Sequence, residues 1–273
     1  MSELTKRILF AAPAAAFFLY ITYLGGFYFV GLVIFVSLLI QYELIDISEG
    51  AGFKADPYFP YTIGIWILLA PFLSHVLIIG LGIFLLFVAI QLFKTGDIGL
   101  KSLISTFFCG IYAPLGMLAL ILVRQLGNSE TGFLLTLTLL LMVWGNDIFA
   151  FFGGKQFGKN HLAPTVSPNK TWEGFFFGIV GGLVGLLIAV YTIPIDFPTS
   201  LLLMLPAVVL VSVFGPIGDL TESRLKRAAS LKDASNILPG HGGFFDRFDA
   251  LILAAPAFYF YLELLRIFDY ATY

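Results

Sequence analysis

The chain alternates between long apolar runs and short polar segments. Its first run, Ile8 to Tyr42, has 35 residues without a charged side chain. One helix of that length would measure about 50 Å, whereas the hydrocarbon core of a bilayer is about 30 Å thick. We therefore expect this run to fold back on itself, and Gly25-Gly26 near its middle predict the turn. The run follows Lys6-Arg7 as a signal peptide would, but its alanines precede the apolar body, which argues against cleavage.

Seven further apolar runs follow, and with the two arms of the first they predict about nine transmembrane helices. The third and fourth of these spans lie close together, so one broken hairpin is the alternative there. The expected fold is an all-α polytopic membrane protein with one continuous membrane domain, because no linker or internal repeat divides the chain. The further runs are Tyr58–Ser74, Val76–Phe93, Leu103–Val123, Thr131–Phe152, Phe175–Ile193, Ser200–Pro216 and Ala250–Phe268.

Lysine and arginine in the connections predict the orientation, because cytoplasmic loops of membrane proteins are rich in these residues. With a cytoplasmic N-terminus, 13 of the 15 basic residues fall on the inner side, and only Arg124 and Arg266 fall outside. We therefore expect the N-terminus to be cytoplasmic and the C-terminus to be outside.

The composition agrees with a membrane protein and excludes other classes. Hydrophobic residues make up 59% of the chain and charged residues 12%, and the mean hydropathy is +0.96. Soluble domains carry about 25% charged residues, so these values exclude a soluble globule as well as a disordered chain. Cys109 is the single cysteine, which excludes a disulfide scaffold, and the formal charge of −2 gives no indication of a nucleic-acid partner.

The polar residues gather in the second half of the chain. Residues 1–130 form an N-terminal scaffold of about five expected helices with short connections. Residues 131–273 form the expected catalytic part and contain two polar segments, Asp147–Gly174 and Gly218–Asp249. The predicted orientation places both segments on the cytoplasmic side.

Three carboxylates flank the eighth and ninth expected spans. Asp219 directly follows an apolar span, and Asp246 and Asp249 are three residues apart, so they share one helix face. Carboxylates near a membrane core are costly without a compensating charge, and hard divalent cations such as magnesium prefer carboxylate oxygen. The alternative for Asp246 and Asp249 is an ordinary first helical turn, where acids suit the helix dipole.

Basic residues and a glycine-rich loop lie between these carboxylates. If the eighth helix continues past Asp219, Lys226 shares its face, and Arg227 and Lys232 follow. Carboxylates, a metal, basic side chains and a glycine-rich loop together suit phosphoryl or nucleotidyl transfer, in which catalysis is mostly positioning and charge neutralisation. The residues that we interpret as solvated loop positions are Glu222, Arg224 and Lys159.

The other polar segment begins inside an apolar span. Asp147 is a functional candidate because acids within membrane spans are costly, and a structural pair with Lys155 is the alternative. Gly153 to Lys159 matches the start of a P-loop, but Asn160 stands where Ser or Thr is required and a membrane helix precedes it, so we reject that interpretation. Ser167-Pro168-Asn169-Lys170 predicts a turn with Lys170 free to meet a phosphate. The glycines expected to serve close helix packing are Gly174, Gly178 and Gly182.

Both polar segments resemble the phosphatidate cytidylyltransferases, also called CDP-diacylglycerol synthases. The C-terminal signature of that family is matched throughout the 27 residues from Ser223 to Asp249, and Asp147, Gly158-Lys159 and Ser167–Thr171 resemble a second block. Asn146 departs from the family pattern, in which a small residue is expected. The matching signature positions are Ser223, Leu225, Lys226, Arg227, Lys232, Asp233, Ser235, Leu238, Pro239, His241, Gly242, Gly243, Asp246, Arg247 and Asp249.

The resemblance implies an enzyme that converts CTP and phosphatidate into CDP-diacylglycerol and pyrophosphate with Mg²⁺, and it leaves open a second cation. It implies catalytic roles for Asp219, Asp246, Asp249, Lys226 and Arg227, with the three aspartates holding the metal. The implied contacts to CTP and its phosphates are Asp147, Lys170, Ser223, Lys226, Arg227, Lys232, Asp233, His241, Gly242 and Gly243.

The expected partners are therefore CTP, phosphatidate and membrane lipid, without a nucleic acid, and a homodimer is left open. The expected location is a bacterial-type inner membrane, with the active site at the cytoplasmic face. The alternatives are a CTP-dependent lipid kinase, a cytidylyltransferase for an isoprenoid lipid, and a transporter in which the polar cluster is a gate.

Overall fold

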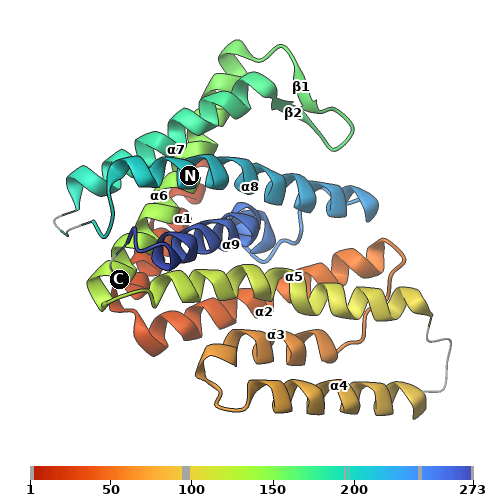
Figure 1. Ribbon diagram of the computed structural model, residues 1–273. Coiled ribbons are helices and arrows are strands. Elements are labelled where there is room, and N and C mark those ends of the chain that lie inside the picture. Colours follow the sequence, from red (N-terminus) through yellow and green to blue (C-terminus); the bar gives the residue numbers. More distant parts are fainter. Residues whose placement is uncertain (1–2, 94–98, 194, 196, 239–241, 272–273) are drawn as a thin grey trace.

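The computed structural model describes residues 3–93, 99–193, 195, 197–238 and 242–271, which form nine α-helices, a short 3-10 helix and a two-stranded sheet (Figure 1). Within this part of the chain the fold is helical throughout except for one small hairpin, as the apolar runs predict. The elements are α1 (Glu3–Leu24), α2 (Gly26–Gly50), α3 (Phe59–Leu69), η1 (Ala70–Phe72), α4 (Val76–Phe93), α5 (Leu100–Arg124), α6 (Ser129–Phe157), β1 (His161–Ala163), β2 (Ser167–Thr171), α7 (Trp172–Thr192), α8 (Leu201–Ala228) and α9 (Phe245–Ile267).

The first apolar run folds back where its glycines predict. Helix α1 ends at Leu24 and α2 begins at Gly26, and Gly25 and Gly26 have φ angles of +65° and +52°. Side chains disfavour this left-handed region, so glycine is the residue that makes the turn without strain. The predicted division of the run into two helices is confirmed.

Helix α5 lies at the centre of the bundle and packs against α2, α3, α6 and α9. Met117 and Leu120 of α5, Ile40 of α2 and Phe258 of α9 are fully buried in this core. Lipid is as apolar as these side chains, so close packing rather than withdrawal from water holds such helices together. Helix α4 lies at the edge of the molecule and packs mainly on α3 (Figure 1).

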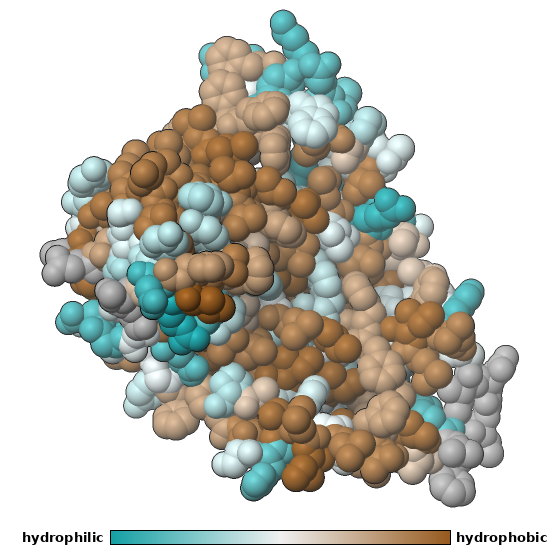
Figure 2. All heavy atoms as spheres, viewed as in Figure 1, coloured by the Kyte–Doolittle hydropathy of each residue, from teal (hydrophilic) through white to brown (hydrophobic). Residues whose placement is uncertain are grey.

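Six helices of the described chain are long and apolar enough to cross a membrane, namely α2, α5, α6, α7, α8 and α9. Three shorter apolar stretches, Ala12–Leu24, Phe59–Phe72 and Val76–Gln91, accompany them. Apolar side chains cover much of the visible surface (Figure 2). On α4, Leu77 is 81% exposed. These features support a multi-pass membrane protein, whereas the count of nine spans and the direction of insertion stay predictions.

Helices α6 and α7 approach each other through small residues. A Cβ atom on Gly174 would lie 2.8 Å from the carbonyl oxygen of Ala150, and one on Gly178 would lie 2.8 Å from the side-chain nitrogen of Asn146. Gly182 in turn faces Ser212 of α8. The expectation that these glycines serve close packing is confirmed, and the pairing fixes how α6 and α7 present the residues at their ends.

One expectation for this region is wrong. The segment Ser167–Lys170, expected as a turn, belongs to strand β2, which pairs antiparallel with β1 through His161–Thr171 and Ala163–Ser167. The turn lies earlier, at residues 164–166. A two-stranded sheet has only edge strands, where proline is tolerated because its missing N–H breaks no interior ladder. The hairpin projects beyond the ends of α6 and α7 (Figure 1).

Arg124 joins two helix turns at the end of the bundle where α5 finishes. Its side chain is buried, and its guanidinium donates to the carbonyl oxygens of Thr22 at 2.8 Å, Tyr23 at 3.1 Å and Ser129 at 3.0 Å. The guanidinium also lies against Gly25, where a Cβ atom would collide with it. Arg124 is therefore a structural residue that satisfies carbonyls left over in the last turn of α1 and ties that turn to the start of α6.

We predict that Arg124→Met lowers the unfolding temperature of the detergent-solubilised protein by about 5–10 °C, because buried carbonyls lose charge-assisted hydrogen bonds. Arg266→Met is the matched control, since Arg266 lies at the same end of the bundle with a side chain that is 54% exposed. Thermal unfolding followed by circular dichroism measures both changes. Equal melting temperatures for the two variants would contradict the structural role.

Candidate active site

A cavity of about 720 Å³ opens where the end of α6, the hairpin and the start of α7 meet the end of α8 and the start of α9. Lys155 and Lys170 lie on its wall, with His161 of the hairpin beside them. The structure brings five of the sequence-predicted site residues together on this one surface. They are Asp147, Lys170, Asp219, Asp246 and Asp249.

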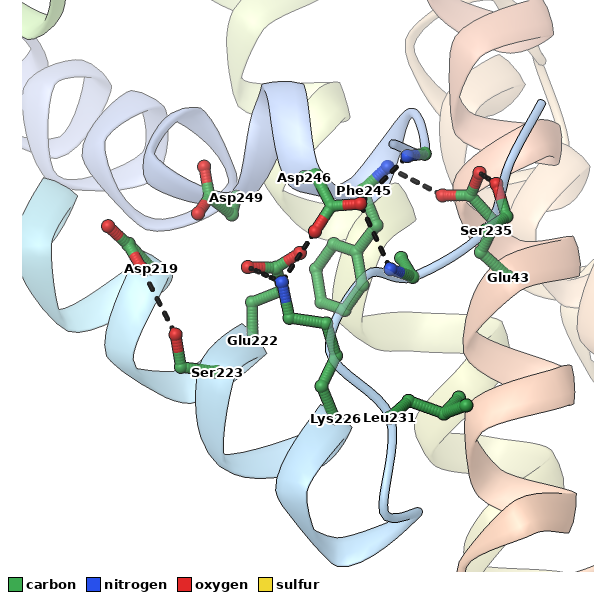
Figure 3. A network of polar contacts seen from close by, with 12 residues as sticks. Glu43, Asp219, Glu222, Ser223, Lys226, Leu231, Ser235, Phe245, Asp246 and Asp249 are labelled. Atoms are coloured by element: carbon green, nitrogen blue, oxygen red, sulfur yellow. Dashed lines mark hydrogen bonds and ion pairs between the residues drawn. The ribbon is translucent and has the colours of Figure 1, made fainter. Parts of the chain in front are cut away.

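Helix α8 continues beyond its apolar portion, as the sequence interpretation required. Asp219, Glu222 and Lys226 follow one another at intervals of three and four residues, which places them on one helix face. Helix α9 begins at Phe245, so Asp246 and Asp249 lie in its first turns. Gly218 packs against the backbone carbonyl of Asp249, where any side chain would collide with it. This close approach places the two acidic helix faces opposite each other (Figure 3).

Three carboxylates converge between α8 and α9. Oxygen atoms of Asp219, Glu222 and Asp249 all lie within 4.8 Å of one another, and one Glu222 oxygen is buried with no hydrogen-bond partner in the described part of the chain. Like charges at this distance repel, and a bound cation relieves that repulsion. Three oxygen donors and an unpaired buried oxygen therefore fit a hard divalent cation such as Mg²⁺.

Lys226 neutralises the other side of this group. Its ammonium lies 3.1 Å from Glu222 and 2.5 Å from Asp246, and its side chain is only 10% exposed (Figure 3). A buried ammonium requires such partners, since an unpaired charge in an apolar environment is very costly. Lys226 thus forms ion pairs with two carboxylates. The contact with a substrate phosphate that the sequence suggested for it stays a prediction.

Asp246 organises the loop that precedes α9. One oxygen of its carboxylate binds Lys226, and the other accepts from the backbone N–H groups of Ala234 at 3.0 Å and Gly243 at 2.7 Å. Gly242, with φ of +80°, makes the bend that brings these amides to the carboxylate. Both oxygens of Asp246 therefore have protein partners, whereas Glu222 retains an unpaired oxygen.

Lys170 of strand β2 reaches across the cavity to α8. Its ammonium lies 2.6 Å from Asp219, an ion pair whose side chains are 24% and 36% exposed. Glu173 holds the base of the hairpin that carries Lys170, because it accepts from the backbone N–H groups of Lys159 and Asn160 and from the Asn160 side chain. The hairpin thus places the Lys170 ammonium beside the carboxylates of the site.

The remaining predicted residues that the structure describes do not line the cavity. Ser223 donates to Asp219 at 3.3 Å, and Arg227 donates to the carbonyl oxygen of Leu231 at 3.0 Å. Lys232 and Asp233 are exposed on the loop after α8. His241 lies outside the described residues.

Sequence reasoning missed two buried acids. Glu222 was interpreted as a solvated loop residue, yet it is 2% exposed and belongs to the carboxylate group. Glu43 of α2 is fully buried and binds the start of α9. Both lie in helices that continue past the ends of the expected apolar runs, at Tyr42 and Pro216, so the run lengths carried no signal for their burial.

Comparison with known proteins agrees with this geometry. The model of the cytidylyltransferase family matches residues 5–265, and the chain belongs to that family. It is 32% identical over 266 residues to the phosphatidate cytidylyltransferase of Brucella abortus, covering 96% of this chain and 94% of the relative. It is also 46% identical over 124 residues to that of Bacillus subtilis and 47% identical over 124 residues to that of Pseudomonas aeruginosa. These two alignments span about half the length of each relative, 45% in both cases.

We predict that Lys226→Met destabilises the protein by about 3–5 kcal/mol, because it leaves Glu222 and Asp246 buried without their cation. Lys232→Met, at an exposed position of the adjoining loop, should be close to neutral. Denaturant unfolding in detergent measures both variants. A Lys226→Met protein as stable as the control would show that the pair is not needed for folding.

Proposed function

We propose that the chain is a phosphatidate cytidylyltransferase, which converts CTP and phosphatidate into CDP-diacylglycerol and pyrophosphate. The observation that carries the proposal is the cavity in which a surplus of carboxylates faces two lysines, within a chain of the cytidylyltransferase family. The similarity of the chain to phosphatidate cytidylyltransferases supports phosphatidate as the lipid substrate.

The reaction needs no covalent enzyme intermediate, because the phosphate of phosphatidate is already a nucleophile. One of its oxygens attacks the α-phosphorus of CTP in line, the bond to the bridging oxygen breaks, and pyrophosphate leaves with the electron pair. The work of the protein is to align the two phosphates and to balance their charge.

Asp219, Glu222 and Asp249 would hold Mg²⁺, which would neutralise charge on the reacting phosphates when bound. This set differs from the one predicted from the sequence, in which Asp246 took the place of Glu222. The difference rests on hydrogen bonding, since both oxygens of Asp246 have protein partners. A second cation stays part of the proposal.

Lys170 supplies a movable charge in this scheme. It pairs with Asp219 at 2.6 Å, and it lies on the wall of the cavity with Lys155. A cation bound by Asp219 would compete with Lys170 for that carboxylate, which frees the ammonium for a substrate phosphate. Lys155 and Lys170 would then bind the triphosphate near the mouth of the cavity.

The proposed location is the inner membrane of a bacterium, with the cavity facing the cytoplasm, where CTP is found. The excess of lysine and arginine in the connections expected on that side supports this direction. Phosphatidate would reach the site from the inner leaflet.

Labelled nucleotide tests the reaction directly. We predict that CTP labelled at the α-phosphate transfers its label to phosphatidate in the presence of Mg²⁺ and releases pyrophosphate in equal amount. Label from the γ-phosphate should stay in pyrophosphate. Transfer of the γ-label to lipid would indicate a lipid kinase. Preference for an isoprenoid phosphate over phosphatidate would indicate a cytidylyltransferase for that lipid. If neither label reached lipid, the cytidylyltransferase and the kinase would both be contradicted.

Substitution of the carboxylates tests the proposed metal site. We predict that Asp219→Asn and Asp249→Asn each lower kcat by about 100-fold or more and weaken Mn²⁺ binding measured by electron paramagnetic resonance. Asp246→Asn should also abolish turnover, because Lys226 and two loop amides lose their acceptor. Asp269→Asn is the matched control, since that carboxylate is exposed just after the end of α9 and does not line the cavity. Unchanged Mn²⁺ binding in Asp219→Asn and Asp249→Asn would remove them from the metal site.

A further inference from the structure

A carboxylate from the first half of the chain accepts hydrogen bonds from the start of α9 and the loop before it. Glu43, on α2, is fully buried and lies outside the residues that line the cavity. It accepts hydrogen bonds from the hydroxyl of Ser235 at 2.5 Å and from the backbone N–H groups of Phe244 at 2.9 Å and Phe245 at 2.6 Å. Figure 3 shows this carboxylate reaching from its own helix to the loop before α9.

These bonds replace a cap that α9 lacks in its own sequence. The N-cap residue, Phe244, has no side chain that can accept from the first helical N–H groups. Glu43 provides that acceptor from another helix, and its negative charge suits the positive end of the α9 dipole. A Cβ atom on Gly243 would collide with the Glu43 carboxylate, so glycine at this position lets the two segments approach.

Two carboxylates hold the described residues at both ends of the loop between α8 and α9. Asp246 accepts from Ala234 and Gly243, and Glu43 accepts from the neighbouring Ser235 and Phe244. The loop between α8 and α9 is thereby tied to α2, which packs on the central helix α5. The start of α9, which carries Asp249 in its second turn, is tied to α2 through Glu43 and to α8 through the Lys226–Asp246 pair.

We propose that Glu43 is a positioning residue. It sets the affinity for a divalent cation of the cluster formed by Asp219, Glu222 and Asp249. The inference rests on the proposed function for the identity of the cation site. Metal coordination tolerates only a few tenths of an ångström in ligand position, so a small displacement of Asp249 from Asp219 and Glu222 weakens binding. Glu43 acts on that distance through the backbone of α9 without touching substrate.

Glu43→Gln tests the proposal on the purified full-length protein. The glutamine has the same size, but an NH₂ group replaces one of the two carboxylate oxygens. This group is itself a donor, so it cannot accept from the donors that the oxygen bound. We expect the dissociation constant for Mn²⁺, measured by electron paramagnetic resonance without substrate, to rise about tenfold. Turnover at low Mg²⁺ should fall, and raised Mg²⁺ should restore part of it, with the KM for CTP at saturating Mg²⁺ unchanged.

Two further variants separate positioning from folding. Glu49→Gln makes the same chemical change on α2 at an exposed carboxylate, and it should leave Mn²⁺ binding at the wild-type value. Ser235→Ala removes one of the three hydrogen bonds to Glu43, together with one that its hydroxyl accepts from the Ile237 N–H at 3.2 Å. It should produce a smaller rise in the same constant even if Glu43→Gln does not fold.

Wild-type Mn²⁺ affinity in a folded Glu43→Gln protein, or in Ser235→Ala where Glu43→Gln does not fold, overturns the proposal. A lower melting temperature with unchanged Mn²⁺ affinity overturns it as well, because that result is what a purely structural cap would give. The binding measurement needs no turnover. Failure of wild type to transfer CMP to phosphatidate would therefore be seen separately, as failure of the proposed function.

Discussion

Charge balance at one end of an apolar bundle is the constraint on which the site depends. Five carboxylates gather there within a few helical turns, and two lysines oppose them. Lys226 is buried between Glu222 and Asp246, and Lys170 pairs with Asp219. Oxygen atoms of Asp219, Glu222 and Asp249 lie within 4.8 Å of one another. Negative charge that the lysines leave uncompensated there favours a cation between these oxygens.

The rest of the structure keeps this charged group in place. Glycine at position 218 lets α8 approach the backbone of α9, and glycines on α7 let it pack closely against α6 and α8. The hairpin between α6 and α7 carries Lys170 over the cavity, and Glu173 holds its base. Small residues in apolar helices thus determine where the few ionised side chains meet, because helices in lipid associate through close packing.

The opposite end of the bundle handles a buried charge differently. Arg124 donates to backbone carbonyls of α1 and α6 and to the hydroxyl of Ser129. These neutral acceptors solvate the guanidinium, and in doing so they join α1 to α6 and stabilise the fold. The two ends therefore differ: one gathers carboxylates and lysines around a cavity, whereas the other joins helix turns.

The sequence by itself determined the helical membrane class, the turn at Gly25-Gly26 and the family, because hydrophobic run length, glycine punctuation and a 27-residue signature are local properties. It also predicted that Asp219, Asp246 and Asp249 lie together, since helix periodicity fixes which residues share a face. Only the tertiary structure decided the partners of those residues. Glu43 lies about 200 positions from the amides it binds, and Glu222 is buried because of how α9 packs on α8. Such contacts depend on the relative placement of whole helices, which no spacing along the chain encodes.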